Sequence, residues 1–585
     1  MKPRALLIEF AILAVAAVGV LSAQAPTQFV PVTDKMLENP DPGDWLMWRR
    51  TLNSWGYSPL AQITKANVAK LQQVWTRGMG AGIQEATPLV YRGTMYLPNP
   101  ADDTVALAAA TGKELWKYKR PVPEDVSKWF NGAPFKSRNI AIYGDKIIDL
   151  SVDDFVYAVN ATDGKAAWET RIVDYREDSA QQTSGPIAAK GKIFSGRACE
   201  FKVPGENSCV VTAHDARTGK ELWRFHTIPK KGEPGYESWG NVPEELRKHV
   251  GTWMPPSYDP ELNLLYIGTS VTSPAPKFLL GGNDKKYLYH NSTLAINADT
   301  GKLVWYYQHI VDHWDLDHPF ERILVDTQVA PDKSEVTWIN PKIKAGERRK
   351  VLTGIPGKTG IVYTLDRQTG EFLWARPTNY QNVVSKIDGA TGEVTVNPET
   401  TFDRAGQERL VCPNSNGGKN FPAGAYSPLN NAMFMPVQNT CMIVSATADT
   451  IDPRSAYMLN SRAQLAPGAD KVGTVHAVSA STGKTLWKFE TRAGAMSLAA
   501  TGGGLVFAGD SIGGFRALDQ DTGKVLWEVN LGAPVTGYPV TYLAGGKQYV
   551  AVSTGTSLVS AAVNRLTPEL KQVIANNLYV FALPE

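Results

Sequence analysis

Apolar and polar residues alternate in short runs along most of this chain, and many of these runs end in a glycine turn followed by a tryptophan. Examples are VTAHDARTGKELW at residues 211–223, TLAINADTGKLVW at 293–305 and FRALDQDTGKVLW at 515–527. Alternation predicts a strand with one buried face, and a Thr-Gly or Asp-Gly turn between two such runs predicts a β-hairpin. In seven places the glycine of a Thr-Gly or Asp-Gly turn precedes a tryptophan by four residues: Gly112 and Trp116, Gly164 and Trp168, Gly219 and Trp223, Gly301 and Trp305, Gly370 and Trp374, Gly483 and Trp487, and Gly523 and Trp527.

Repetition of this hairpin at intervals of about 40 residues or more is typical of the blades of a β-propeller. A blade cannot bury its faces alone, so we expect each tryptophan to pack against the neighbouring blade. The two ends supply an eighth unit, because KLQQVWTRG at residues 70–78 has the tryptophan without its turn and NNLYVFALPE at 576–585 has the strand without a following turn. The sequence therefore predicts an all-β, eight-bladed propeller, a single domain over residues 26–585, with its ring closed by pairing of the N- and C-terminal strands.

The composition argues against a nucleic-acid-binding surface and agrees with an exported protein. The 585 residues include 60 Lys and Arg against 57 Asp and Glu, a formal net charge of +3, and no basic run stands out. Residues 1–25 are typical of a secretory signal peptide, in which Lys2 and Arg4 precede the apolar run Phe10–Leu21 and the small-residue exit AQA at 23–25. This apolar run is too short to span a bilayer comfortably, so we expect no membrane span. The signal peptide predicts a location in the periplasm or outside the cell.

Four cysteines fit an oxidising compartment. Cys199 and Cys209 bracket a short loop, and Cys412 and Cys441 bracket an insertion, so we expect two disulfides. A metal cluster is the alternative, but the close pair has no further Cys or His at ligand spacing. The chain contains no Cys-x-x-Cys-His motif, which excludes covalently attached c-type haem.

The densest group of polar residues is HWDLDH at residues 313–318, directly after the fourth turn. Asp315 and Asp317 are two residues apart, so in an extended segment both carboxylates point to the same side. Paired carboxylates can hold a hard cation, and one of them can act as a general base beside it. The alternative is a solvated loop in which Asp315 caps a turn. The neighbouring polar residues are interpreted as supporting structure: Asp312, His313 and His318.

Three segments together with the tryptophan repeat carry a resemblance to a known family: WDLD at 314–317, VGTWMPPSYDPELNLLYIGTS at 250–270 and PGKTGIVYTLDRQTG at 356–370. With these motifs the chain resembles the pyrroloquinoline-quinone (PQQ)-dependent alcohol dehydrogenases of the methanol and ethanol type, from residue 45 to the C-terminus. Members of that family fold as eight-bladed propellers and bind PQQ and a metal ion near the ring axis. The resemblance therefore implies a quinoprotein that oxidises a primary or secondary alcohol to an aldehyde or ketone.

The resemblance also assigns roles to individual residues. Asp315 matches the catalytic aspartate, which takes the alcohol proton while hydride passes to the quinone. Trp253 matches the tryptophan that stacks on the quinone plane, and Glu200 falls near the metal-binding glutamate. The remaining family contacts with the cofactor fall on Glu85, Arg138, Thr183, Lys358, Asn420 and Phe421.

Three positions depart from the family pattern. Gly132-Ala133 replaces a pair of neighbouring cysteines that lies over the quinone. Val271 stands where a metal-binding asparagine is expected, which makes Thr272 a candidate oxygen donor. Asp317, two residues after the catalytic position, is similar to the lanthanide-dependent branch and adds a carboxylate ligand. The expected metal ligands are Glu200, Thr272, Asp315 and Asp317, with Ca²⁺ as the first choice and a lanthanide ion as the alternative.

Electrons from the reduced cofactor need an acceptor. With no haem motif and no nicotinamide-type glycine-rich helix start, we expect a separate cytochrome c or another periplasmic acceptor. The small Gly132-Ala133 pair leads to the hypothesis that a bulky secondary alcohol or polyol is the substrate. A non-catalytic propeller that acts as an envelope assembly scaffold would explain the repeats but not the matched site residues. A secreted hydrolase is disfavoured, since no Ser-His-Asp pattern or paired Glu motif is evident.

Overall fold

Strands make up nearly all of the regular structure in this protein. The computed structural model describes residues 29–129, 138–178, 180–199, 209–452, 455 and 457–585. In these residues the only α-helices are α1 (Asp34–Glu38) and α2 (Leu558–Asn564). Short 3-10 turns occur at η1 (Val68–Lys70), η2 (Val126–Lys128), η3 (Tyr236–Trp239), η4 (Glu244–Leu246), η5 (Lys277–Leu280), η6 (Pro398–Thr400) and η7 (Pro568–Leu570). The all-β prediction is confirmed.

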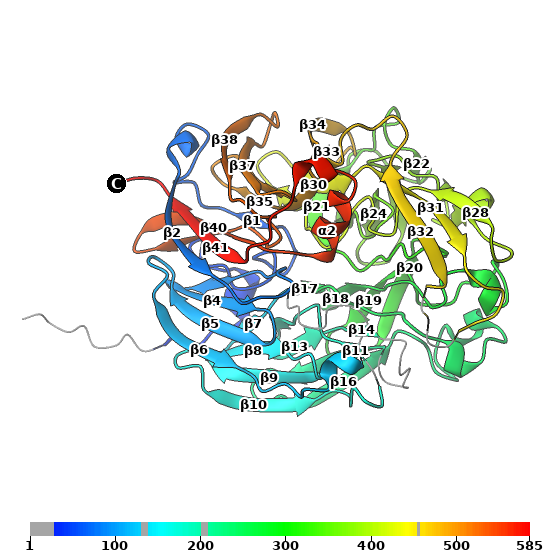
Figure 1. Cartoon of the computed structure of the whole chain (residues 1–585), viewed down its shortest axis with the longest axis horizontal. Coiled ribbons are helices and arrows are strands. Elements are labelled where there is room, and N and C mark those ends of the chain that lie inside the picture. Colours follow the sequence, from blue (N-terminus) through cyan, green and yellow to red (C-terminus); the bar gives the residue numbers. More distant parts are fainter. Residues whose placement is uncertain (1–28, 130–137, 179, 200–208, 453–454, 456) are drawn as a thin grey trace, which may run out of the picture.

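Within the described residues, eight sheets have four or five strands, and they follow one another around a common centre in chain order (Figure 1). Four of them comprise β3 (Leu89–Tyr91), β4 (Thr94–Asn99), β5 (Asp103–Ala108) and β6 (Glu114–Lys119); β7 (Ala141–Tyr143), β8 (Lys146–Leu150), β9 (Phe155–Asn160) and β10 (Ala166–Arg171); β12 (Ile187–Ala189), β13 (Lys192–Ser195), β15 (Val210–Asp215) and β16 (Glu221–His226); and β17 (Ser257–Asp259), β18 (Leu264–Gly268), β19 (Ser292–Asn297) and β20 (Leu303–Gln308).

The next three sheets comprise β21 (Ile323–Val329), β23 (Glu347–Gly354), β24 (Ile361–Asp366) and β25 (Phe372–Pro377), edged by β22 (Trp338–Ile339); β29 (Ala425–Ser427), β30 (Ala432–Gln438), β33 (Gly473–Ser479) and β34 (Thr485–Thr491); and β35 (Ala495–Thr501), β36 (Leu505–Asp510), β37 (Gly514–Asp519) and β38 (Val525–Asn530), to which β1 (Tyr57–Ser58) adds in parallel. Smaller sheets decorate this frame: β11 (Ala180–Gln181) with β14 (Ala198–Cys199), β26 (Val384–Ile387) with β27 (Val394–Val396), and β28 (Glu408–Val411) with β31 (Thr440–Ala446) and β32 (Leu459–Leu465).

The eighth sheet joins the two ends of the described chain. It contains β39 (Val540–Ala544), β40 (Lys547–Thr554) and β41 (Asn577–Ala582), and its last strand is β2 (Gln72–Gly78). Strands β2 and β41 run antiparallel, with Trp75 opposite Val580. The N- and C-terminal runs that the sequence singled out therefore pair with each other.

Six of the seven tryptophans of the repeat lie over the glycine turn of the next repeat, and the seventh, Trp527, packs on Phe581 of the neighbouring sheet. A Cβ atom on Gly164, which has a φ of 70°, would lie 2.5 Å from Cε3 of Trp116. Since that space is filled by the indole, glycine is needed both for the left-handed backbone and for the close approach. The same contact joins Trp75 to Gly112, Trp168 to Gly219, Trp223 to Gly301, Trp305 to Gly370, Trp374 to Gly483 and Trp487 to Gly523. The predicted packing of each tryptophan on its neighbour is confirmed.

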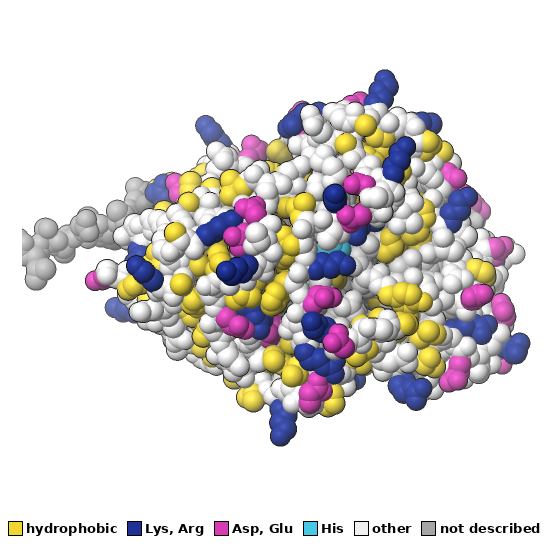
Figure 2. Space-filling view, turned by 90° about the horizontal axis from the view of Figure 1, so that it is seen from above, with side chains coloured by type: hydrophobic (Ala, Val, Ile, Leu, Met, Phe, Trp, Pro, Cys, Tyr) yellow, Lys and Arg dark blue, Asp and Glu magenta, His cyan; other side chains and the backbone are white. Residues whose placement is uncertain are grey.

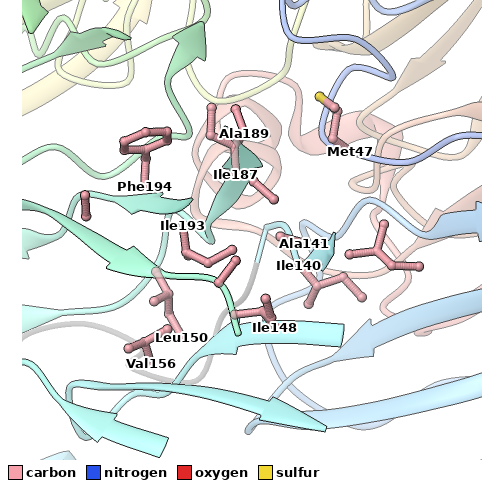
Figure 3. Close-up of a cluster of buried hydrophobic side chains, with 14 of the residues drawn as sticks. Met47, Ile140, Ala141, Ile148, Leu150, Val156, Ile187, Ala189, Ile193 and Phe194 are labelled. Carbon is pink, nitrogen blue, oxygen red and sulfur yellow. The ribbon is translucent and has the colours of Figure 1, made fainter. Parts of the chain in front are cut away.

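Adjacent sheets are held together by apolar side chains between their faces. Figure 3 shows Ile148 and Val156 of one sheet pointing toward Ile193 of the next. These side chains are at most 2% exposed. Burial of a side chain of this size stabilises a fold by about 1.5–3 kcal/mol, so face-to-face packing supplies most of the cohesion between sheets.

Both predicted disulfides are present. Cys199 is bonded to Cys209 and Cys412 to Cys441, with Cα atoms 5.1 and 4.2 Å apart. The second bond ties the residue after β28, in the segment between the fifth and sixth large sheets, to β31, which is inserted between β30 and β33 of the sixth sheet. All four cysteines of the chain are used, which rules out a cysteine metal cluster.

The face of the molecule drawn in Figure 2 carries charges of both signs. Figure 2 shows lysine and arginine side chains interspersed with aspartate and glutamate over the face in view. None of the helices in the described ranges has the length and apolar character needed to cross a membrane. The predicted signal peptide, residues 1–25, lies outside the described residues.

Candidate active site

The predicted site residues gather at one end of the large sheets because they occupy equivalent places in them. Most of them stand in the loop that leads into the first strand of their sheet, whereas Lys358 lies between β23 and β24. Glu85 precedes β3, Arg138 precedes β7, Thr183 precedes β12, Trp253 precedes β17, Asp315 and Asp317 precede β21, and Asn420 and Phe421 precede β29. Loops at equivalent strand ends of neighbouring sheets converge, so residues far apart in the chain, such as Arg138 and Phe421, meet.

Arg138 is the centre of the first half of the site. Its Nη2 lies 2.7 Å from Oε2 of Glu85, and its Nη1 donates to the carbonyl oxygens of Thr183 at 2.9 Å and Trp253 at 3.1 Å. The guanidinium carbon lies 5.0 Å from the Trp253 ring centroid and 5.5 Å from that of Phe421. Arg138 is buried, yet its Nε atom has no hydrogen-bond partner in the described residues. The structure thus brings five of the predicted residues together around one cation.

The second half of the site is an ion cluster around Lys358. Its Nζ lies 2.8 Å from Oδ1 of Asp315 and 3.1 Å from Oδ2 of Asp317. The other oxygen of Asp317 accepts the backbone N–H of Val271 at 2.8 Å, and Oδ2 also accepts the indole N–H of Trp253 at 3.3 Å. Asp317 therefore connects the lysine to the aromatic ring, and through it to the Arg138 half.

The two aspartates differ in exposure and in protonation behaviour. The side chain of Asp315 is 19% exposed and that of Asp317 is 6% exposed. Burial raises the pKa of Asp315 well above its usual range, against the opposing charge of Lys358. Burial also disfavours ionisation of Asp317, but the charge of Lys358 outweighs it and the pKa of Asp317 is lowered. Asp317 is therefore the more readily ionised carboxyl of the pair, and Asp315 is the more exposed one.

Asp315 is held in place from behind by buried polar groups. Its φ of 71° lies in the left-handed region, so its loop needs outside support. Oδ1 of Asp312 accepts the backbone N–H of Trp314 at 2.6 Å, and its Oδ2 accepts the backbone N–H of Leu316. Asn291 donates from Nδ2 to Oδ2 of Asp312 and to the carbonyl of Leu316, both at 3.0 Å. The alternative of a solvated loop is wrong for this segment, and Asp312 has the supporting role expected for it.

The donor set fits the expected cofactor. A planar polycarboxylate needs cationic donors and an aromatic face, and Arg138, Lys358 and the partly exposed ring of Trp253 supply them. The unpartnered Nε of Arg138 adds a buried donor at the same place. Asn420 is less directly placed: its amide contacts Asn416 and Phe421.

A hard cation fits the aspartate pair, although the described residues supply only part of a coordination shell. Asp315 and Asp317 converge on one positive group, the ammonium of Lys358. In the described part of the chain, no three His, Cys, Asp or Glu side chains are grouped to hold a metal ion. Glu200, the expected third ligand, lies outside the described residues, as does Gly132-Ala133. Thr272 is buried and donates its hydroxyl to the carbonyl of Lys248 at 2.8 Å, and it makes no hydrogen bond to either aspartate among the described residues.

Sequence reasoning missed Phe320, whose ring packs edge-on against Trp253 at a centroid distance of 5.4 Å. It also missed the buried ion pair between Glu321 and Lys419. Both contacts join residues far apart in the chain. The available signal was position: Phe320 and Glu321 stand three and four residues after the end of WDLD, and Lys419 is next to Asn420.

Comparison with known proteins places this geometry among quinone-dependent enzymes. Residues 45–395 match the family described as "Glucose/ethanol/alcohol dehydrogenase, beta-propeller domain", and residues 470–567 match the family of the outer membrane protein assembly factor BamB. The chain is 31% identical to the dehydrogenase subunit of the quinone alcohol dehydrogenase of Gluconobacter oxydans (strain 621H), over 88% of this chain and 70% of that protein. It is 31% identical to the quinohemoprotein alcohol dehydrogenase ADH IIB of Pseudomonas putida, over 92% and 78%. A solved europium-containing methanol dehydrogenase, 27% identical, superposes with a TM-score of 0.82 over 94% of this chain and 100% of that one.

Proposed function

The chain belongs to the PQQ-dependent alcohol dehydrogenase family, and from that premise we propose that it oxidises a primary or secondary alcohol to an aldehyde or ketone with Asp315 as the base. The observation that carries this proposal is the placement of Lys358 between Asp315 and Asp317, beside the Trp253 ring. That arrangement offers a proton acceptor, a fixed charge and a stacking face within one buried site.

PQQ, when bound, supplies the hydride acceptor that no side chain of this chain can provide. Trp253 would hold its planar face, and Arg138 and Lys358 would hold its carboxylate and carbonyl oxygens. Glu85, Thr183, Asn420 and Phe421 complete the proposed contacts. Among these, Glu85 acts through Arg138, because its carboxylate lies 2.7 Å from Nη2 of that side chain.

Proton transfer is assigned to the carboxylate of Asp315. Its side chain is 19% exposed, against 6% for Asp317, so Asp315 is the carboxylate of the pair that a substrate can reach. Lys358 fixes the orientation of the carboxylate by bonding Oδ1 and the backbone carbonyl of Asp315 at 2.8 and 3.1 Å. The buried walls around the site exclude bulk water, which strengthens these charge interactions.

A metal ion is proposed at the aspartate pair, with Asp315, Asp317, Glu200 and Thr272 as the ligand set. Ca²⁺ is the first choice, and a lanthanide is the alternative that Asp317 favours. The likeness to the europium-containing methanol dehydrogenase supports the alternative. When bound, such an ion would supply positive charge to a developing oxyanion.

The proposal also covers the closure of the propeller, the export of the protein and its electron acceptor. The eight large sheets would form a closed ring of eight blades in one domain over residues 26–585, supported by the β2–β41 pairing. Residues 1–25 would act as a signal peptide that directs the protein to the periplasm, which agrees with its two disulfides. The electron acceptor would be a separate cytochrome c, since the chain has no haem-attachment motif.

The match of residues 470–567 to an assembly factor keeps a second candidate, a non-catalytic envelope scaffold. The experiment that separates the two is reconstitution of the purified chain with PQQ and either Ca²⁺ or La³⁺, followed by reduction of an artificial dye. Methanol, long-chain, cyclic and sugar alcohols are compared. PQQ-dependent dye reduction with any of them supports the dehydrogenase, and saturable PQQ binding without turnover on the whole panel supports the scaffold. A strong preference for methanol would contradict the bulky-alcohol hypothesis.

A further inference from the structure

Four charged side chains are sealed inside the protein next to the candidate site. Arg49, Glu321, Arg322 and Lys419 are between 0 and 3% exposed. Lys419 Nζ lies 2.7 Å from Oε2 of Glu321. Oε1 of Glu321 accepts the backbone N–H of Gly424 at 2.8 Å, and the carbonyl of Gly424 accepts Nη2 of Arg49 at 2.6 Å. We call these four residues the buried charge cluster.

The cluster supports the aromatic side chains of the site. Nζ of Lys419 lies 4.6 Å from the ring centroid of Phe320, and that ring packs edge-on against Trp253 at 5.4 Å. The guanidinium carbon of Arg49 lies 5.9 Å from the ring of Tyr538, which in turn meets the ring of Phe421 at 6.3 Å. A charge in the cluster is therefore separated from the proposed stacking face by a single layer of apolar rings.

The charges in the cluster do not balance. Three cations surround one carboxylate, and Nε and Nη1 of Arg49 have no hydrogen-bond partner in the described residues. Burial lowers the pKa of Arg49 to about 10 and that of Arg322 to about 9, so both stay protonated at neutral pH. Burial also lowers the pKa of Lys419, and its partner Glu321 opposes that change.

An excess of positive charge without solvent is costly for a folded protein. Hydrogen bonds from Arg49 and Arg322 to backbone carbonyls offset part of this cost, and negative charge nearby offsets more, because apolar rings screen a charge far less than water does. The side of the cluster covered by Phe320 faces Trp253, where the proposed function places a polyanionic cofactor. Reduction of a quinone adds two electrons, here taken from the alcohol, and any negative charge that protons do not neutralise is stabilised by cations close by.

We propose that the buried charge cluster sets the reduction potential of the bound quinone by stabilising its reduced, more negative form. Lys419 and Glu321 are positioning residues that act on the quinone without touching it. Their effects on its reduction potential are opposite, because they carry opposite charges at nearly the same place. The inference rests on the proposed function, and it adds an electrostatic role for residues that do not touch the cofactor.

The test compares the midpoint potential of bound PQQ in three variants of the holoenzyme, followed by the absorbance of the quinone during a redox titration. Lys419→Gln removes a positive charge and is expected to lower the potential. Glu321→Gln removes the negative charge and is expected to raise it. The double variant restores the net charge and is expected to return close to the wild-type value. Each single change is expected to alter the quinone–quinol equilibrium about tenfold, which is about 30 mV for a two-electron couple.

A purely structural role predicts a different pattern, in which both single variants shift the potential the same way or not at all and the double variant is the most perturbed. That pattern overturns the inference. If Lys419→Gln does not fold, Glu321→Gln and the double variant still decide between the two patterns. The control is Arg516→Gln, which breaks a partly buried pair with Asp510 on strands β36 and β37 and is expected to leave the potential unchanged. A wild-type chain that retains no PQQ overturns the proposed function itself, and the inference with it.

Discussion

Trp253 donates its indole N–H to Asp317, with 3.3 Å between Nε1 and Oδ2, and this bond joins the aromatic half of the site to its charged half. The same carboxylate accepts the backbone N–H of Val271 at 2.8 Å. These two bonds orient the Trp253 ring and the loop at Val271, the position where the family has a metal-binding asparagine. They do not depend on a metal ion at Asp317. One aspartate therefore has two separable tasks, and different substitutions can tell them apart.

Asp317→Leu is expected to reduce kcat/KM at least tenfold, because it leaves two buried donors unpaired at a cost of about 1–3 kcal/mol each. Asp317→Asn keeps an acceptor oxygen for one donor and removes the charge, so it is expected to retain Trp253 fluorescence while losing metal affinity. Steady-state kinetics and metal titration measure the two effects. Equal metal affinity in Asp317→Asn and wild type would contradict the ligand role.

Lys358→Met is expected to destabilise the metal-free protein by about 3–5 kcal/mol, because removal of one partner leaves two buried carboxylates without a counter-charge. Addition of Ca²⁺ or La³⁺ is expected to recover part of that loss, since either cation can replace the ammonium. Lys358→Arg is the matched control and should stay close to wild type. Chemical denaturation with and without metal provides the measurement, and a variant as stable as wild type would show that the aspartate pair does not depend on Lys358.

Gly164→Ala tests the contact between neighbouring sheets. The added Cβ would lie 2.5 Å from Trp116, and the φ of 70° is itself unfavourable for alanine. Gly93→Ala is the control, because Gly93 has a φ of 79° and no atom within 4 Å of its Cβ position. The backbone cost of about 1–2 kcal/mol is common to both, so the melting temperature should fall further in Gly164→Ala. Equal losses would mean that the indole contact contributes nothing beyond backbone strain.

His214 predicts an acid-sensitive component of stability. It is fully buried without a hydrogen bond in the described residues, and burial lowers its pKa from 6.5 to about 4. The unfolded chain therefore binds a proton that the folded chain rejects, so stability is full above pH 6.5 and falls between pH 6.5 and 4 by about 3 kcal/mol. His214→Leu is expected to flatten the decline of melting temperature between pH 7 and 5. An unchanged slope would show that His214 titrates normally in the folded protein.

Much of the frame was predictable from local pattern. The seven glycine turns identify strand pairs, and the tryptophan after each turn predicts packing against the neighbouring sheet. The structure adds that the indole lies on a turn glycine, which leaves no room for a Cβ. The pairing of β2 with β41 followed from two incomplete repeats at the ends. Local sequence pattern does not predict contacts such as Arg49 with Gly424 or Lys419 with Glu321. The partners are far apart in the chain, and their separation does not repeat from one sheet to the next.

The site was predictable only in part, for a related reason. Taken singly in the sequence, Arg138 and Lys358 predict only ordinary surface cations. The resemblance to a family was needed to predict that they belong to one site. Their burial comes from neighbours on other sheets, such as Glu85 and Asp317. Thr272 shows the limit of position alone, because its hydroxyl bonds to Lys248 instead of turning toward the aspartates.

The most direct test of the account is the PQQ-dependent oxidation of alcohol by wild type and Asp315→Asn, both reconstituted with PQQ and saturating metal. Wild type is expected to require PQQ for turnover. The variant is expected to bind PQQ as wild type does, because Arg138, Trp253 and Lys358 remain, and to lose turnover by a factor of about 10²–10⁴ or more. Near-normal turnover in Asp315→Asn, or turnover by wild type without PQQ, would contradict the proposed mechanism.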